Sequence, residues 1–204
     1  MSELINVILV LNKKLKIDDR RKSIQAIVSA SNDWFDIPDS ITLFDWGLGI
    51  EKHESWHDDN LLKCPLSETQ LLILKNSKDN LIIKSIIIDY QFDKTIFNIS
   101  IPYNNFKKIT RNDFEYWIFN IFKYMDLFSI ILIEVSSEGE LNINKRNDLD
   151  IILDSMNNLR GNFYVMISNN FDIDINYKFK IFKKNEIATL IVKDDIFDIL
   201  NFKK

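Results

Sequence analysis

The sequence predicts an α+β fold, in which helices pack on a mixed, largely antiparallel sheet. Strand and helix patterns alternate near the start and again over residues 129–168, as they do in strand–helix–strand crossovers. Paired apolar runs at 81–103 and 176–192 are typical of antiparallel hairpins. With 204 residues, 46% of them hydrophobic, we expect one compact domain over 1–204, with two lobes meeting near 60–80 as the alternative.

The first third of the chain predicts a strand, a helix and a second strand. Residues 4–11 (LINVILVL) are continuously apolar and β-branched, which predicts a strand covered on both faces. Residues 18–31 begin with acidic side chains and carry an apolar stripe at helical spacing. Residues 40–46 predict a short strand. Residues 47–69 predict irregular structure, apart from a helix around the two histidines. The capping-box spacing at 67–70 predicts a short helix after it.

The clearest helix in the rest of the chain is expected at 111–126, where Thr110 is placed to cap it. Trp117 lies in the middle of its apolar stripe, so we expect this side chain to be buried. The other expected elements are strands at 81–90, 94–103, 129–135, 162–168, 176–182 and 186–192, and helices at 147–159 and 194–200.

Composition and charge narrow the classes of function. The net charge of −4 and the sequence pI near 5.3 argue against nucleic acid as a partner, because phosphate binding favours basic proteins. No stretch approaches the roughly 20 apolar residues needed to span a bilayer, so we expect no membrane association. Cys64 is the single cysteine, which excludes an internal disulfide and favours a cytoplasmic location.

Both histidines of the chain lie in the motif HESWH, residues 53–57. On a helix, His53 and His57 would point the same way and could hold zinc, with Glu54 as the base that activates a bound water. The sequence offers no third histidine, and charged residues flank the motif. We therefore expect no metal, no cofactor and no catalytic residue, and keep a zinc-dependent hydrolase as the alternative function.

Residues 33–59 combine many carboxylates with three of the four tryptophans. Exposed aromatic rings anchor protein interfaces, and an acidic surround attracts a basic partner. The alternative interpretation places the aromatic rings in the core and the carboxylates at the solvent-exposed edge of the core. The predicted partner-binding residues are Asp33, Trp34, Asp36, Asp45, Trp46, Glu51, Glu54, Trp56, Asp58 and Asp59.

In its size, acidity, α+β pattern and lack of catalytic motifs, the chain resembles the small acidic immunity proteins of bacterial polymorphic-toxin and contact-dependent inhibition systems. The resemblance implies a non-catalytic cytoplasmic protein that binds a cognate toxin and blocks its active site. The partner would then be a basic toxin domain. Carboxylates of the inhibitor would occupy the place where such a toxin holds its substrate phosphates.

Overall fold

The structure is a computed structural model of the 204-residue chain. It describes residues 4–11, 14–29, 37–58, 62–63, 67, 69–79, 81–90, 94–106, 108–124, 130–136, 163–168, 180–184 and 188–192. The helices expected at 147–159 and 194–200 lie outside the described residues.

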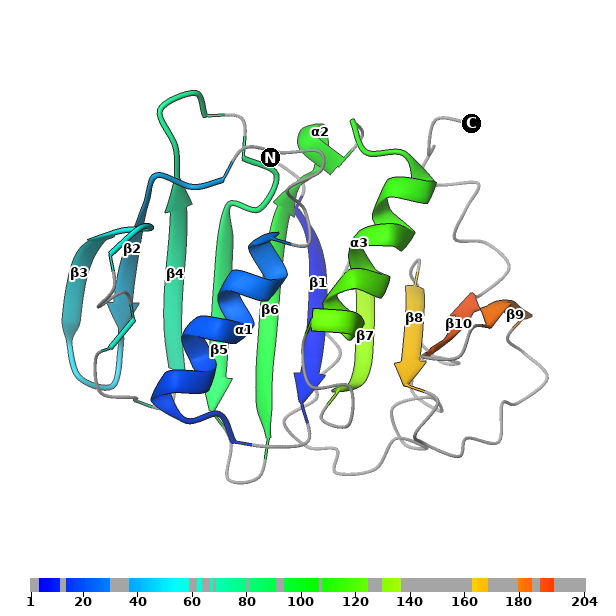
Figure 1. The fold of residues 1–204 in the computed structure, drawn as a ribbon, viewed down its shortest axis with the longest axis horizontal. Coiled ribbons are helices and arrows are strands. Elements are labelled where there is room, and N and C mark those ends of the chain that lie inside the picture. Colours follow the sequence, from blue (N-terminus) through cyan, green and yellow to red (C-terminus); the bar gives the residue numbers. More distant parts are fainter. Residues whose placement is uncertain are drawn as a thin grey trace.

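A ten-stranded sheet forms the body of the protein, in the order β3-β2-β4-β5-β6-β1-β7-β8-β10-β9 (Figure 1). In chain order its strands are β1 (Leu4–Leu11), β2 (Ser40–Asp45), β3 (Ile50–Ser55), β4 (Thr69–Lys75), β5 (Ser85–Tyr90), β6 (Thr95–Pro102), β7 (Ile130–Ser136), β8 (Phe163–Ser168), β9 (Lys180–Lys184) and β10 (Ala188–Val192).

All the described strand pairs are antiparallel, including the expected hairpins β5–β6 and β9–β10. The two parallel crossovers suggested by the sequence are wrong. β1 and β2 are not neighbours, and β7 pairs with β8 in the antiparallel sense. Alternating strand and helix patterns predict the order of the elements along the chain. Which strands lie side by side depends instead on pairing between residues that are far apart in the sequence.

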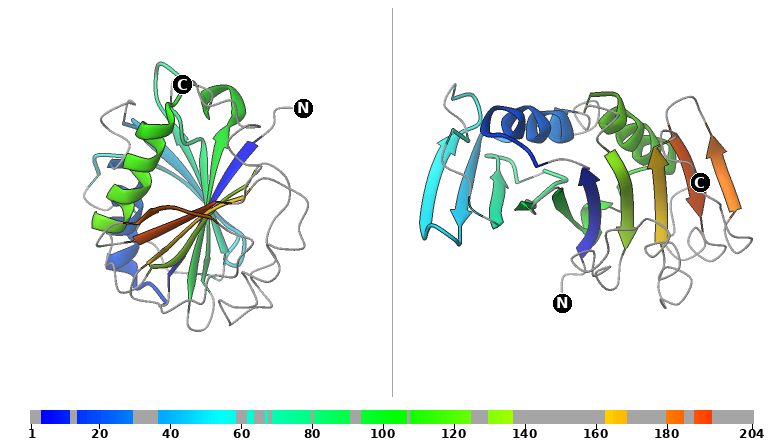
Figure 2. Two further views of the ribbon diagram at one scale, coloured as in Figure 1. Left: turned by 90° about the vertical axis from the view of Figure 1, so that its right-hand side faces the viewer. Right: turned by 90° about the horizontal axis from the view of Figure 1, so that it is seen from below.

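In the described part of the chain, three helices accompany the sheet: α1 (Ile17–Ser29), α2 (Tyr103–Phe106) and α3 (Arg111–Tyr124). Figure 2 shows α1 and α3 on the same face of a strongly twisted sheet. This arrangement confirms the α+β class. None of the helices that the structure describes is long and apolar enough to cross a membrane.

The core lies between the helices and the face of the sheet that they cover. Successive side chains of a strand point to opposite faces, so Ile5 and Leu9 of β1 point toward the helices, beside Phe97 and Ile99 of β6. All four are completely buried. Ile8, on the opposite face of β1, is also buried, as the continuous apolar run predicted.

Helix α3 begins where the sequence placed it and faces the core as expected. The backbone N–H of Asp113 donates to the Thr110 hydroxyl at 3.2 Å, and the Thr110 N–H donates to the Asp113 carboxylate at 3.3 Å. These reciprocal bonds cap the helix. Trp117 is buried, as predicted, and its indole N–H donates to the carbonyl of Ile27 in α1 at 3.0 Å, which joins the two helices.

Two local predictions between the first and second helices are wrong. The segment expected to form a helix around the histidines is β3, and the capping-box spacing at 67–70 leads into β4 rather than a helix. In β4 the side chains of Gln70, Leu72 and Leu74 alternate inward, while β2 and β5 pair with its two edges. Burial with a period of two and pairing on both sides outweigh a local helix signal.

Candidate functional site: the hairpin at the sheet edge

Much of the acidic, aromatic segment forms the β2–β3 hairpin at one end of the sheet (Figure 1). Among the described strands, β3 pairs only with β2, so its outer backbone edge has no strand partner there. Four of the predicted partner-binding residues, Asp33, Trp34, Asp36 and Asp59, lie outside the described residues. The hairpin and the residues just after it hold the other six.

The two histidines do not share a helical face. His53 lies in β3 and His57 follows the strand in a turn, while Glu54 points to the opposite face from His53. The His53 Nδ1 atom is hydrogen bonded to the Thr42 hydroxyl at 2.9 Å, and its Nε2 atom lies 3.4 Å from a Glu51 carboxylate oxygen. The helical geometry that zinc binding by this motif requires is therefore not formed.

Within the described part of the chain, no three side chains of the His, Cys, Asp and Glu types come together in a way that could hold a metal ion. Cys64 and Glu68 lie outside the described residues. The described residues thus supply two histidines as possible zinc ligands, and no third ligand lies beside them.

We expect the HESWH segment to have no zinc-dependent stability. Protein purified without chelator should carry little zinc by elemental analysis. His53→Ala should change the free energy of unfolding by about 1 kcal/mol or less, because it removes one hydrogen bond at an exposed edge. His57→Ala serves as the matched variant, since His57 is exposed and lies outside the strand. Near-stoichiometric zinc that disappears in both variants would restore the hydrolase hypothesis.

A buried polar network lies beside the hairpin and joins it to α1. The Arg20 guanidinium, completely buried, donates to the side-chain oxygen of Gln70 and to the backbone carbonyl of Leu62. The amide nitrogen of Gln70 donates to a carboxylate oxygen of Asp45 at 2.6 Å, and the Tyr90 hydroxyl donates to the Gln70 oxygen at 3.3 Å. The amide of Gln70 therefore connects a buried cation to a buried carboxylate.

Asp45 is part of the interior and not of the partner surface that the sequence suggested. Burial disfavours its charged form, but hydrogen bonds from Gln70, Ser67 and the backbone of Leu48 outweigh that effect and hold the pKa of the Asp45 carboxyl below its usual 3.8. One carboxylate oxygen accepts from the Leu48 N–H at 2.9 Å. Asp45 thus fixes the turn that follows it.

That turn, residues 46–49, presents two apolar side chains to solvent. Trp46 is 58% exposed and Leu48 is 48% exposed. Gly49 has a φ of 63°, which favours glycine. A side chain at Gly47 would come within 2.7 Å of the Ser67 Cβ atom, so glycine permits the close approach there. We call Trp46 and Leu48 the turn tip; the sequence pattern pointed to Trp46 but not to Leu48.

The other predicted residues divide between surface and interior. Glu51 and Asp58 are exposed, whereas Trp56 is buried, which corrects its assignment to the partner surface. Glu54 is half-buried and accepts a hydrogen bond from the Leu62 N–H at 2.8 Å. Glu51 lies just after the turn tip, and Asp58 lies in the turn beyond the far end of β3, where its N–H donates to the Ser55 carbonyl at 3.1 Å.

We define the edge surface as the turn tip together with the exposed side chains along and beyond β3. Its members are Trp46, Leu48, Glu51, Lys52, His53, Ser55, His57 and Asp58. The surface combines an apolar end, unpaired backbone groups on its outer side within the described structure, and more carboxylates than lysines. Such a surface can bind a protein segment, with aromatic anchoring at one end and charge pairing along its length.

Comparisons with known proteins give no family assignment. No family model matches the sequence, and no curated protein matches it. The structure is similar to that of the Pseudomonas aeruginosa T6SS protein PA0821, with a TM-score of 0.48 and 9% sequence identity, over 93% of this chain and 68% of that chain. A similarity of this extent does not carry a function from one protein to the other.

Proposed function

We propose that this protein is a non-catalytic, cytoplasmic binding protein that neutralises a toxin by covering its basic active site with the edge surface. The observation that carries the proposal is the exposed turn tip at the end of an acidic sheet edge. The resemblance in size, acidity and fold pattern to bacterial immunity proteins supplies the class of partner.

The turn tip has the properties of an interface anchor. Large aromatic side chains that become desolvated on binding contribute much of the free energy of protein association. Trp46 is exposed in a short turn that Asp45 and the Leu48 N–H hold in place. Because the turn is already ordered by these contacts, little conformational entropy is lost there when a partner closes over the ring.

The carboxylates along the edge supply the attraction for a basic partner. Glu51 and Asp58 are exposed along β3 and just beyond it, and Lys52 is the single lysine of the edge surface. A toxin that acts on nucleic acid holds phosphates with lysine and arginine, and carboxylates of an inhibitor can take the place of those phosphates. The outer backbone edge of β3 can add main-chain hydrogen bonds to an extended segment of the partner.

The proposal predicts separate effects of charge and of the aromatic ring on binding kinetics. Glu51→Lys combined with Asp58→Lys should slow association most at low salt, because steering acts through a screened field. Trp46→Ala should speed dissociation by about tenfold or more, because the ring anchors the bound state. The partner would be recovered with the tagged protein, and rates measured by surface plasmon resonance at two salt concentrations.

Tyr116→Ala is the matched control for the ring, since Tyr116 is 51% exposed but lies on α3, on the covered face of the sheet. This variant should bind as the wild type does. Unfolding midpoints should stay close to wild type in all variants, because exposed charges contribute little to stability. Unchanged rates in both the charge-reversed and the Trp46→Ala proteins would exclude the edge surface as the binding site.

A further inference from the structure

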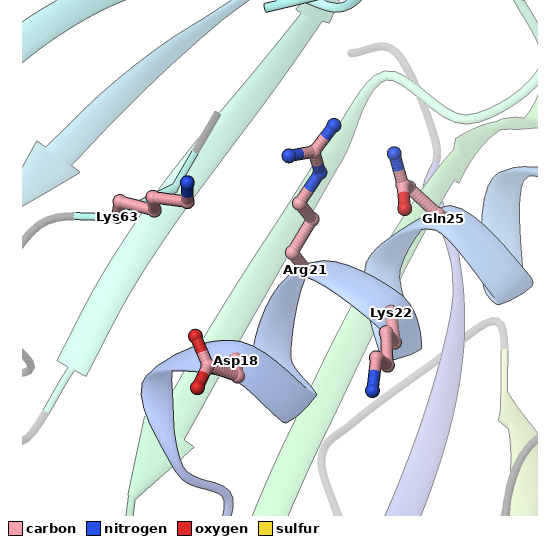
Figure 3. Close-up of a pocket in the computed structure, with 5 residues that line it drawn as sticks. All are labelled: Asp18, Arg21, Lys22, Gln25 and Lys63. Carbon is pink, nitrogen blue, oxygen red and sulfur yellow. The ribbon is translucent and has the colours of Figure 1, made fainter. Parts of the chain in front are cut away.

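A basic hollow lies on the helix side of the sheet, apart from the turn tip. It has a volume of about 440 Å³ and is lined by Asp18, Arg21, Lys22 and Gln25 of α1 and by Lys63. Three cationic side chains thus line it with one carboxylate, although the whole chain carries a net charge of −4. In Figure 3 the Arg21 guanidinium extends between Lys63 and Gln25, while the Lys22 ammonium points away from them.

The segment that carries Lys63 is fixed by the residue before it. Leu62 is completely buried, and its φ of 61° lies in the left-handed region that leucine rarely adopts. Its carbonyl accepts from the buried Arg20 guanidinium, and its N–H donates to Glu54 at 2.8 Å. The N–H and the carbonyl of Leu62 are therefore both hydrogen bonded. These bonds fix the position of the next residue, Lys63, relative to α1.

We propose that this hollow binds the phosphoryl group of a small phosphorylated molecule. A guanidinium presents a planar pair of donors that matches two phosphate oxygens, an ammonium adds a point charge, and a carboxamide adds a neutral donor. Arg21 and Gln25 of α1 and Lys63, which lies between β3 and β4, supply these three groups. The volume is in the range of pockets that hold small ligands.

The size and charge of the surroundings favour a small molecule over nucleic acid. Nucleic-acid binding requires basic side chains spread along the path of several phosphates. Here three basic side chains line one hollow, where Asp18 offsets part of their charge, and the protein as a whole is acidic. One phosphoryl group with a compact substituent fits this distribution, and a polyanion does not.

Titration with inorganic phosphate and with glycerol phosphate at constant ionic strength tests the proposal. Amide shifts in nuclear magnetic resonance spectra should saturate with both ligands and should centre on α1 and Lys63. Arg21→Gln and Lys63→Gln should each weaken binding by about tenfold or more, as the loss of a charge-assisted hydrogen bond predicts. Arg21→Lys should weaken it less than Arg21→Gln, because the charge remains and only the planar fork is lost.

Lys78→Gln is the matched control, because Lys78 is an exposed lysine in the turn after β4, away from the hollow. Lys78→Gln should leave the affinity for phosphate unchanged. Trp46→Ala should also leave it unchanged, which would show that phosphate binding does not depend on the edge surface. Shifts that never saturate, or equal losses in Lys63→Gln and Lys78→Gln, would overturn the proposal. Tighter binding of a short single-stranded oligonucleotide than of glycerol phosphate would also overturn it, by identifying nucleic acid as the ligand.

Discussion

Replacing Trp117 with alanine should destabilise the protein by about 3–5 kcal/mol, as is usual when a large buried ring is removed from a core. Trp117 is 2% exposed, packs at a ring-centroid distance of 5.7 Å from Phe114, and donates to the Ile27 carbonyl. The alanine variant loses the burial of the indole, leaves a cavity in the core, and leaves the Ile27 carbonyl without this donor. Denaturant unfolding followed by circular dichroism measures the change.

The neighbouring aromatic residue provides the comparison. Tyr116 precedes Trp117 on the same helix but is exposed, so Tyr116→Ala should change stability by less than about 1 kcal/mol. Trp117→Phe keeps an aromatic ring and removes the N–H donor, and should fall between the two. Similar losses for Tyr116→Ala and Trp117→Ala would show that α3 does not pack on the sheet through the Trp117 face.

Arg20→Leu should destabilise the protein by about 3–5 kcal/mol, because each buried acceptor that is left without its donor costs about 1–3 kcal/mol. Two buried acceptors, the Gln70 side-chain oxygen and the Leu62 carbonyl, would lose their charged donor. Gln70, whose amide nitrogen also donates to the buried Asp45 carboxylate, would lose the donor on its oxygen. Chemical denaturation at neutral pH, where Asp45 is ionised, is the measurement.

Lys22→Leu is the matched control, because Lys22 lies two residues along α1 and is exposed. Its effect on stability should be within about 0.5 kcal/mol. Combining Arg20→Leu with Gln70→Leu should destabilise less than the sum of the two single changes, because the pair shares one hydrogen-bond network. Additive effects would mean that the two side chains act independently and that the network does not link α1 to the hairpin.

The sequence predicted those parts of the fold whose pattern and surroundings agree. LINVILVL is apolar at every position but one, and β1 lies in the middle of the sheet with strands on both sides. The stripe around Trp117 has helical spacing, and α3 buries that stripe. In each case the local preference and the tertiary environment favour the same structure. The sequence predicted the helix start at Thr110 because capping depends only on residues nearby.

The failures occur where pairing with distant strands decides the structure. HESWH has the letters of a zinc-binding helix, yet the pairing of His53 with Thr42 and of Glu54 with Ile41 places the first part of the motif in a strand. The partner-surface prediction failed at Asp45 for the same kind of reason. Asp45 lies on the inward face because it is paired with Gln70, a residue 25 positions away. No local sequence pattern distinguishes such a buried aspartate from one on the solvent-exposed edge of a hairpin.

The central place of β1 has a consequence for the order of events during synthesis. β1 pairs with β6 on one side and with β7 on the other, and β7 ends at Ser136. At usual rates of translation, about 6–25 s pass between the synthesis of Leu11 and that of Ser136. During this interval an apolar strand has been made whose two native neighbours do not yet both exist. The nascent chain must therefore keep this apolar strand away from other chains until β7 has been made.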